Sequence, residues 1–178
     1  MSEAEDWIIN HYVRKQIWKK LGQPHHQIRF DWGAKNAIGE TFADIGCVLG
    51  DGTSELARRK PGKWTGVDVS ERGIAMATEK HPELTFLCAK DLNQLPVGMF
   101  DTVFCSEVLE HVEYDMAYAK SLLRLAKKRL LITTPHRYVN DPGHLRIYTD
   151  VGLRRLFEPA AITIEKVERY WFAIVDKA

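Results

Sequence analysis

From residue 40 onward, short apolar runs alternate with longer segments in which charged and small apolar residues are mixed. The apolar runs span residues 41–45, 64–68, 84–88, 100–105 and 129–133. The intervening segments with helical length and composition span residues 52–59, 70–80 and 114–126, and Ser70 is in position to cap the second of them. Strands that alternate with helices predict βαβ units, and therefore a parallel sheet with helices on both faces.

The C-terminal part departs from this alternation. Thr149 is in position to cap a helix over residues 150–157, which Pro159 would end. Two β-rich runs, 162–167 and 170–175, follow with a short connection between them. Such a connection predicts an antiparallel pair. Together with the five earlier runs, this pair predicts a seven-stranded, mostly parallel sheet of the doubly wound α/β class.

The N-terminal part has a helical pattern of its own. Apolar residues recur every four positions from Ile9 to Leu21, which places them on one face of a helix. We therefore expect an amphipathic helix over residues 1–22, ended by Gly22 and Pro24. Residues 23–39 contain Gly, Pro and many polar residues. They are expected to form a loop that leads into an α/β core over residues 40–178.

Composition agrees with one compact domain spanning residues 1–178. The chain is 45% hydrophobic and 28% charged, which is ordinary for a globular protein. Its 25 basic and 24 acidic residues give a net charge of +1, so no overall field favours nucleic acid or an anionic membrane. A small-molecule partner is therefore expected.

The cysteines and the N-terminus indicate a cytoplasmic protein. Cys47, Cys88 and Cys105 lie in or beside strand-like segments without metal-ligand spacing, and we expect reduced thiols. The first six residues are acidic rather than basic, and no apolar run approaches membrane-spanning length. Export and membrane insertion are both disfavoured by this pattern.

Candidate chemistry lies where the predicted strands end, because ligands of open α/β sheets bind beyond the carboxyl ends of the strands. The first strand ends in Asp44 and a turn that contains Gly46, Gly50 and Gly52. This turn lacks the GKS or GKT of a nucleotide P-loop and the GxGxxG of dinucleotide sites. Asp44 suits a cationic ligand. Asp68, eighteen positions after Gly50 at the end of the second strand, is placed to bind ribose hydroxyls.

Residues 40–158 resemble the class I S-adenosylmethionine-dependent methyltransferases. The matching stretches are residues 44–50, 66–70, 91–96 and 100–112, in the order of the family's motifs. The resemblance implies the Rossmann-like methyltransferase fold and S-adenosylmethionine as the cofactor, with S-adenosylhomocysteine as its product. It also implies cofactor-binding roles for Asp44, Gly46, Cys47, Gly50, Asp68, Val69, Asp91, Leu92 and Ser106.

Within that set, the resemblance implies particular positions. Asp44 and Gly46 would lie at the methionine part, Asp68 at the ribose, and Ser106 beside the sulfonium. Asp91 and the backbone of Leu92 would lie at the adenine.

One position departs from the family's pattern. Val48 stands where the family has the middle glycine of its first motif, and a β-branched residue resists positive φ. The loop must be displaced, use Gly50 and Gly52, or bind the cofactor weakly. An alternative function is therefore a binding protein with a catalytically degenerate methyltransferase fold.

The acceptor side of the predicted site contains several histidines. In the resembling family, stretches similar to residues 134–138 and 144–149 form the wall over the reactive methyl group. His111, His136 and His144 are candidate bases, because imidazoles titrate near neutral pH. The function predicted is methyl transfer to an oxygen, nitrogen or carbon atom of a small molecule.

A second alternative concerns the same segment. Glu107, Glu110, His111 and His144 also resemble the metal-binding set of RNA terminal 2′-O-methyltransferases. The same Glu-Val-Leu-Glu-His string occurs in metal-free small-molecule members, and the chain lacks the length for an RNA-reading addition. The metal-free interpretation is preferred, with no metal site predicted.

Overall fold

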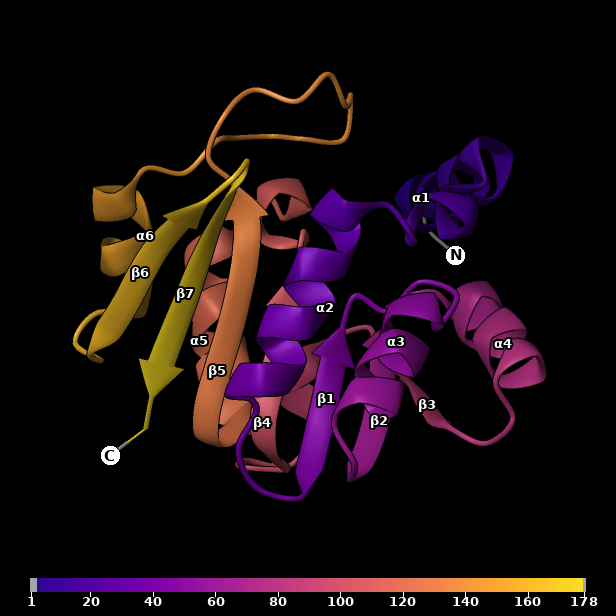
Figure 1. Ribbon diagram of the computed structural model, residues 1–178, viewed down its shortest axis with the longest axis horizontal. Coiled ribbons are helices and arrows are strands. Elements are labelled where there is room, and N and C mark those ends of the chain that lie inside the picture. Colours follow the sequence, from indigo (N-terminus) through magenta and orange to yellow (C-terminus); the bar gives the residue numbers. More distant parts are fainter. Residues whose placement is uncertain (1–2, 178) are drawn as a thin grey trace.

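The computed structural model describes residues 3–177 (Figure 1). Seven strands in this part of the chain form one sheet in the order β3-β2-β1-β4-β5-β7-β6. Strands β1 to β5 pair in parallel, whereas β7 runs antiparallel to both β5 and β6. The predicted seven-stranded, mostly parallel sheet is confirmed. The strands are β1 Thr41–Ile45, β2 Lys63–Asp68, β3 Thr85–Cys88, β4 Phe100–Ser106, β5 Ala126–Pro135, β6 Ile162–Val167 and β7 Tyr170–Asp176.

Helices cover both faces of this sheet. In Figure 1, α2 and α3 lie in front of the strands, and α5 and α6 lie behind them. The α-helices are α1 Glu3–Lys15, α2 Pro24–Asn36, α3 Asp51–Arg59, α4 Glu71–Lys80, α5 Asp115–Leu125 and α6 Asp150–Phe157. The short 3₁₀ helices are η1 Ile17–Lys20, η2 Leu92–Gln94 and η3 Leu109–His111. No helix within residues 3–177 combines the length and apolar character that crossing a membrane would need.

Two apolar cores form because successive side chains of a strand point to opposite faces of the sheet. On the face covered by α2 and α3, Phe104 belongs to a buried cluster with Phe30 and Leu56. On the opposite face, its neighbour Val103 belongs to a cluster with Leu122 of α5. The central strands are therefore buried on both sides, which explains their almost continuous apolar character.

The N-terminal region differs from the prediction. The helix expected over residues 1–22, of which the structure describes residues 3 onward, ends at Lys15 and is followed by η1. Gln16 between them has a left-handed φ of 48°. Residues 24–36, expected to lie in a loop, form α2.

Pro24 and Gly33 misled the prediction, because each has a place in α2. Pro24 occupies the first helical turn, where its missing N–H costs nothing. Gly33 packs so closely on the sheet that a Cβ atom there would lie 2.8 Å from Phe104 Cε2.

The predicted helix caps are confirmed. Ser70 Oγ accepts a hydrogen bond from Gly73 N at 3.0 Å, at the start of α4. Thr149 Oγ1 accepts one from Gly152 N at 3.1 Å, at the start of α6. Both caps satisfy backbone N–H groups that lack a partner within the helix.

Candidate functional site

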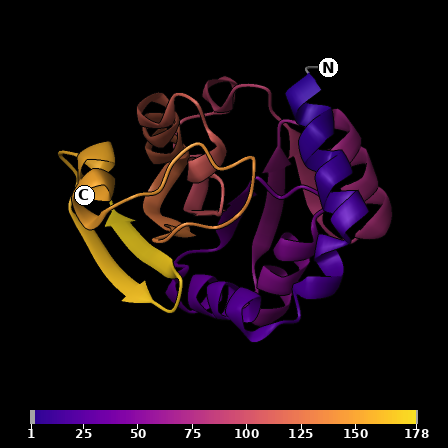
Figure 2. The same cartoon turned by 90° about the horizontal axis from the view of Figure 1, so that it is seen from above.

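A cavity of about 860 Å³ lies at the carboxyl ends of β1, β2 and β4. Its wall also includes residues of α1, α2 and the loop 136–149. Viewed from above, α1 runs along one side of this end of the sheet and the loop crosses the other (Figure 2). The chain reverses its strand order at β1, so the cavity occupies the switch point where open α/β sheets bind ligands.

The structure brings most of the predicted site residues to this cavity. Gly50, Asp91 and His136 are the predicted residues that do not contribute to its wall. Those that line it are Asp44, Gly46, Cys47, Asp68, Val69, Leu92, Ser106, His111 and His144.

The turn after β1 depends on two glycines. Gly46 has a φ of 79°, and a Cβ atom there would lie 2.5 Å from Val108 Cγ2. Gly50 has a φ of 76°, and its Cβ would lie 2.6 Å from Phe86 Cζ. Both the left-handed backbone and the lack of space require glycine. Gly50 therefore shapes the turn and caps α3 without reaching the cavity.

Val48 adopts the left-handed conformation that a valine was expected to resist. Its φ is 52°, and its N–H donates a 3.0 Å hydrogen bond to Asp68 Oδ2. A non-glycine residue in this conformation costs about 1–2 kcal/mol. The turn thus keeps a glycine-type backbone with a valine side chain in the cavity wall.

Asp44 is a buried carboxylate at the base of the cavity. It is 6% exposed, and its Oδ2 accepts a 2.7 Å hydrogen bond from Thr53 Oγ1. Burial, with a smaller contribution from the charge of Asp68, raises the pKa of Asp44 to about 6. The hydrogen bond from Thr53 and the charge of Arg29 oppose this rise. A cationic ligand beside Asp44 would therefore be favoured, because it compensates the buried charge.

Asp68 joins the glycine turn to the start of α4. Its Oδ2 accepts from Val48 N, and its Oδ1 accepts from Ser70 N at 2.9 Å. A carboxylate has acceptor capacity beyond two hydrogen bonds, so this side chain can also receive ligand hydroxyls. The two backbone contacts fix its orientation at the cavity edge.

Of the two residues predicted to lie at the adenine, Leu92 lines the cavity and Asp91 does not. Val69, Ala89 and Leu92 present apolar surface to the cavity. Asp91 is exposed and caps η2 by accepting a 2.9 Å hydrogen bond from Asn93 N. The apolar residues can pack on a flat aromatic ring, whereas Asp91 lies outside the cavity wall.

Arg29 is a site residue that the sequence reasoning missed. It is 6% exposed, and its Nη1 donates a 2.8 Å hydrogen bond to Ser106 Oγ. Its guanidinium lies 5.3 Å from the ring centre of Tyr170. Because α2 was predicted as a loop, nothing indicated that Arg29 would reach the cavity. An arginine between Ile28 and Phe30 was the available signal.

Glu107 follows β4 in a strained conformation, with a φ of 58°. Its N–H donates to Thr133 O at 2.9 Å, and its side chain lines the cavity. Burial raises the pKa of Glu107 to about 7, against the opposing charge of Arg29. Strained residues of this kind concentrate at functional sites.

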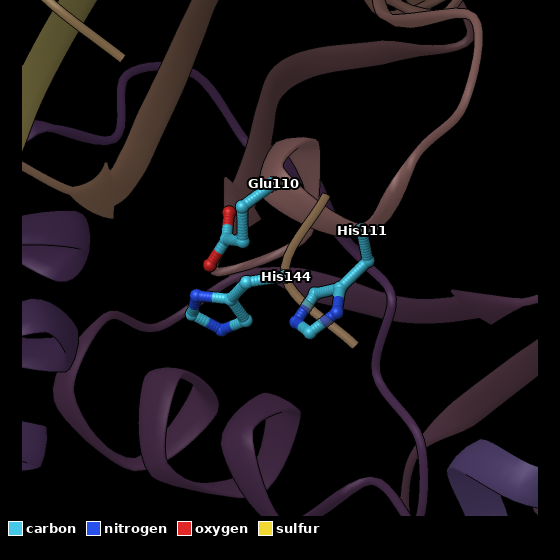
Figure 3. A group of neighbouring side chains, drawn as sticks. All are labelled: Glu110, His111 and His144. Carbon is cyan, nitrogen blue, oxygen red and sulfur yellow. The ribbon is translucent and has the colours of Figure 1, made fainter. Parts of the chain in front are cut away.

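Glu110, His111 and His144 lie together beside the cavity (Figure 3). Glu110 is fully buried, and burial together with the charge of Glu107 raises its pKa well above the usual range. His111 Nδ1 is 2.9 Å from Gly143 O, and its ring centre is 4.7 Å from that of His144. Burial lowers the pKa of both histidines. Two of the three predicted bases are thus brought together.

His136 lies elsewhere. Its Nε2 is 2.8 Å from Glu168 O, in the turn between β6 and β7. Its ring packs against Trp171 with 5.5 Å between ring centres. The structure therefore gives His136 backbone and aromatic contacts outside the cavity wall.

Comparison with known proteins bears on this geometry. A family model described as a methyltransferase domain matches residues 43–132, about half of the chain. The match begins in β1 and ends in β5, so it includes the strands that end at the cavity.

Curated relatives match over a similar region. A 2-methyl-6-phytyl-1,4-hydroquinone methyltransferase from Synechocystis sp. is 32% identical over 102 residues, covering 54% of this chain and 32% of that protein. A trans-aconitate 2-methyltransferase from Afipia carboxidovorans is 35% identical over 105 residues, covering 58% of this chain and 41% of that protein. The chain thus spans about a third to two fifths of the length of these two relatives.

A solved structure matches over nearly the whole chain. A magnesium protoporphyrin IX methyltransferase from Synechocystis, solved with bound S-adenosylhomocysteine, superimposes with a TM-score of 0.71 at 21% identity. The match covers 97% of this chain and 100% of that one. At this identity the likeness shows a shared fold.

Proposed function

Because the chain belongs to the class I S-adenosylmethionine-dependent methyltransferases, we propose that it transfers the methyl group of S-adenosylmethionine to an oxygen, nitrogen or carbon atom of a small molecule. One observation carries this proposal. A single cavity combines the glycine turn, Asp44 and Asp68 at one end with Ser106, His111 and His144 at the other. Its volume of about 860 Å³ lies within the range of small-molecule sites.

The donor set of the cavity fits this cofactor part by part. Asp44 can face its cationic methionine end, and the Arg29 guanidinium can bind the methionine carboxylate. Asp68 can accept hydrogen bonds from the ribose hydroxyls. Val69, Ala89 and Leu92 offer an apolar surface to the adenine.

The chemistry requires mainly alignment. When bound, S-adenosylmethionine supplies an electrophilic methyl group, which the acceptor attacks in line while the carbon–sulfur electron pair returns to sulfur. The protein holds the acceptor opposite the leaving sulfur and accepts its proton where the acceptor carries one. His111 and His144 are placed for that proton, because both line the cavity.

The alternative of a catalytically degenerate binding protein rested on Val48 in the turn after β1. That turn is not displaced. Val48 keeps the left-handed backbone and bonds Asp68, so the turn retains its shape. The proposal therefore keeps catalysis. It also includes a cytoplasmic protein with a single domain, supported by three cysteines that form no disulfide within residues 3–177 and by one continuous sheet.

Calorimetry with S-adenosylhomocysteine tests the proposal on the full chain. We expect one ligand to bind per chain. Absence of binding at millimolar ligand, with the protein folded, would overturn the proposal. Asp91→Ala tests separately whether Asp91 contacts the adenine. The affinity of this variant for S-adenosylhomocysteine should fall only if the exposed carboxylate reaches the ligand.

Asp68→Ala tests the ribose contact. We expect S-adenosylhomocysteine binding to weaken by more than 1 kcal/mol, the order of a hydrogen bond to a charged group. Since Asp68 also holds Val48 and Ser70, the 2′-deoxy analogue of the ligand serves as a control. The wild type should prefer the ribose ligand, and Asp68→Ala should lose that preference. A preserved preference would place the ribose elsewhere.

A further inference from the structure

The turn between β6 and β7 carries an arginine into the cavity wall. Arg169 lines the cavity and is partly buried. Its side chain has no hydrogen bond or ion pair with the side chains and backbone that the structure describes. The backbone of the turn is fixed, because His136 N donates a 3.1 Å hydrogen bond to Arg169 O and His136 Nε2 donates one of 2.8 Å to Glu168 O. A guanidinium without a partner, on a fixed backbone beside a cavity, is available to a ligand.

The first turn of α2 places donors at the same end of the sheet (Figure 1). His25 and His26 both line the cavity, and their ring centres are 4.2 Å apart. Arg29 Nη2 lies 2.7 Å from His26 Nδ1. Because a guanidinium only donates, Nδ1 accepts this bond, and the proton of the neutral ring is on Nε2. His26 therefore offers an N–H donor to a further partner.

Positive charge is concentrated around these rings. Lys20 lines the cavity together with Arg29 and Arg169. Burial, followed by the charge of Arg29, lowers the pKa of His26 to about 3, and the charges of Arg169 and Lys20 act in the same direction. His26 is thus neutral at physiological pH, and three permanent cations act on the space beside it.

The acidic residues of the cavity do not neutralise these cations. None of Lys20, Arg29 and Arg169 forms an ion pair with a carboxylate that the structure describes. Glu107 also lines the cavity, but burial raises its pKa to about 7, so it is partly protonated at neutral pH. When the cofactor binds, its single carboxylate can pair with Arg29. Lys20 and Arg169 then remain for a second anion.

We propose that the methyl acceptor carries an anionic group, a carboxylate or a phosphate, which Arg169 binds together with His25 and His26 at the start of α2. A guanidinium can hold either group through two parallel hydrogen bonds. The N-terminal end of the helix dipole favours negative charge, and the first turn of α2 contains no acidic residue. This inference names a substrate class for the proposed function and rests on it.

An anion held at this point orients the acceptor. Binding energy from a group remote from the reacting atom can align that atom with the methyl group. His111 and His144 are not used to hold the anion, so they stay available for the proton of the acceptor. The site therefore adds a specificity contact without replacing any residue of the proposed reaction.

Nuclear magnetic resonance of the histidine side chains tests the site on the full chain saturated with S-adenosylhomocysteine. The probes are inorganic phosphate and acetate, which carry the anionic group without the rest of an acceptor. Each is titrated at constant ionic strength, with chloride as the balancing ion. We expect saturable shifts of the His25 and His26 resonances at millimolar anion. The probe that binds more tightly assigns the anion as a phosphate or a carboxylate.

Replacement of Arg169 is the decisive variant. Arg169→Gln should lose about tenfold or more of the anion affinity, because hydrogen bonds to a charged group are lost. Arg169→Lys keeps the charge without the paired donors and should bind with an intermediate affinity. Arg137→Gln, at an exposed arginine outside the cavity wall, should bind the anions as the wild type does.

Calorimetry with S-adenosylhomocysteine on the same samples separates this inference from the proposed function. Wild type and Arg169→Gln should bind this ligand equally. A weaker affinity in Arg169→Gln would assign Arg169 to the methionine carboxylate and overturn the acceptor site. Absence of saturable shifts in the folded wild type, or shifts that survive Arg169→Gln, would also overturn it. If the wild type binds anions through Arg169 but does not bind S-adenosylhomocysteine, the proposed function fails while the anion site stands.

Discussion

Val48 and Asp44 each carry an energetic cost beside the cavity. Val48 adopts a backbone conformation that suits glycine, and Asp44 is a carboxylate removed from water. Each has a partner that holds it in place, Asp68 for Val48 and Thr53 for Asp44. Residues in energetically unfavourable states persist only where the surrounding structure holds them, and they are concentrated at functional sites.

The strain at Val48 predicts that Val48→Gly stabilises the protein. Relief of the left-handed conformation gains about 1–2 kcal/mol, and the greater freedom of glycine in the unfolded chain offsets about half of this. We expect a net gain of about 1 kcal/mol in urea unfolding. Affinity for S-adenosylhomocysteine should change little, because the turn already has its shape.

Val69→Gly is the matched control for this prediction. Val69 also lines the cavity but does not have a positive φ, so its replacement by glycine should destabilise. A large gain of cofactor affinity in Val48→Gly would instead indicate a degenerate site.

Asp44 predicts a pH dependence of cofactor binding. Its pKa, raised by burial from 3.8 to about 6, means that protonation of Asp44 stabilises the free protein. That contribution is complete below pH 3.8 and is lost as the pH rises through 6. A cationic cofactor requires the ionised form. Its affinity should therefore fall below pH 6, by up to about tenfold per pH unit.

Calorimetry of S-adenosylmethionine binding between pH 5 and 8 would measure this dependence. The Asp44→Asn variant separates the contribution of Asp44 to this pH dependence from the contributions of Asp68, Arg29 and the cavity histidines. This variant should bind weakly, with a flatter profile, while being more stable than the wild type at pH 7. An Asp44→Asn profile as steep as that of the wild type would assign the titration to another group.

Among the elements, α2 is the helix that the sequence pattern did not predict. Its residues cover the sheet beside α3, and Arg29 on the same helix reaches the cavity. Local signals favoured a loop because Pro24 and Gly33 usually interrupt helices. In this protein, proline begins the helix, and glycine allows a close approach to Phe104.

The packing of α2 predicts that Gly33→Ala is destabilising. In an exposed helix this change stabilises by about 1 kcal/mol. Here the added Cβ would lie 2.8 Å from Phe104 Cε2 and 3.2 Å from Leu56 Cδ2. Overpacking of this kind costs about 1–3 kcal/mol, measurable by urea unfolding. Cofactor affinity should also fall, because displacement of α2 moves Arg29.

Gly22→Ala provides the control for this change. Apart from the adjoining residues of the chain, a Cβ atom there would have no neighbour within 4 Å in the described part of the structure, so stability should change by less than about 0.5 kcal/mol. Equal effects of the two substitutions would show that the Phe104 contact is unimportant.

At the scale of the whole molecule, the two ends of the sheet have different roles. The carboxyl ends of the strands surround the cavity, whereas Asp101 organises the opposite end. Its Oδ2 accepts hydrogen bonds from Glu40 N and Thr41 N at 2.9 and 3.2 Å. Its Oδ1 is 2.9 Å from Lys128 Nζ. These contacts hold the pKa of Asp101 well below its usual range and join the starts of β1, β4 and β5.

Asp101→Asn should therefore reduce stability without changing cofactor affinity. We expect a loss of about 1–3 kcal/mol at pH 7, because buried backbone donors lose a charged acceptor. The stabilisation by Asp101 is present above its unfolded pKa of 3.8. The difference from wild type should therefore shrink as the pH falls below that value. Urea unfolding at pH 7 and pH 3 would measure it.

Asp31→Asn, at an exposed partner of Arg59, should change stability by less than about 0.5 kcal/mol. A weakened affinity for S-adenosylhomocysteine in Asp101→Asn would contradict the separation of the two ends.

The sequence by itself determined the class of the sheet and the strand ends that carry the chemistry. Alternating apolar runs and helical segments predicted all seven strands. For the central strands the reason is that a strand buried on both faces must be apolar along its length. Ser70 and Thr149 were predicted as caps because capping is local. Asp44 and Asp68 were recognised from their positions at strand ends, and Ser106 from the resemblance to the methyltransferase family. All three line the cavity.

Only the tertiary structure decided which distant residues meet. Arg29 reaches Ser106 across 77 positions, and His111 reaches Gly143 across 32. It also excluded His136 from the cavity and gave Val48 a stable hydrogen-bond partner. These outcomes depend on packing between elements, which periodicity and local propensity do not encode. The sequence pattern of a single segment shows which of its faces will be buried. The site, in contrast, forms where several segments come together.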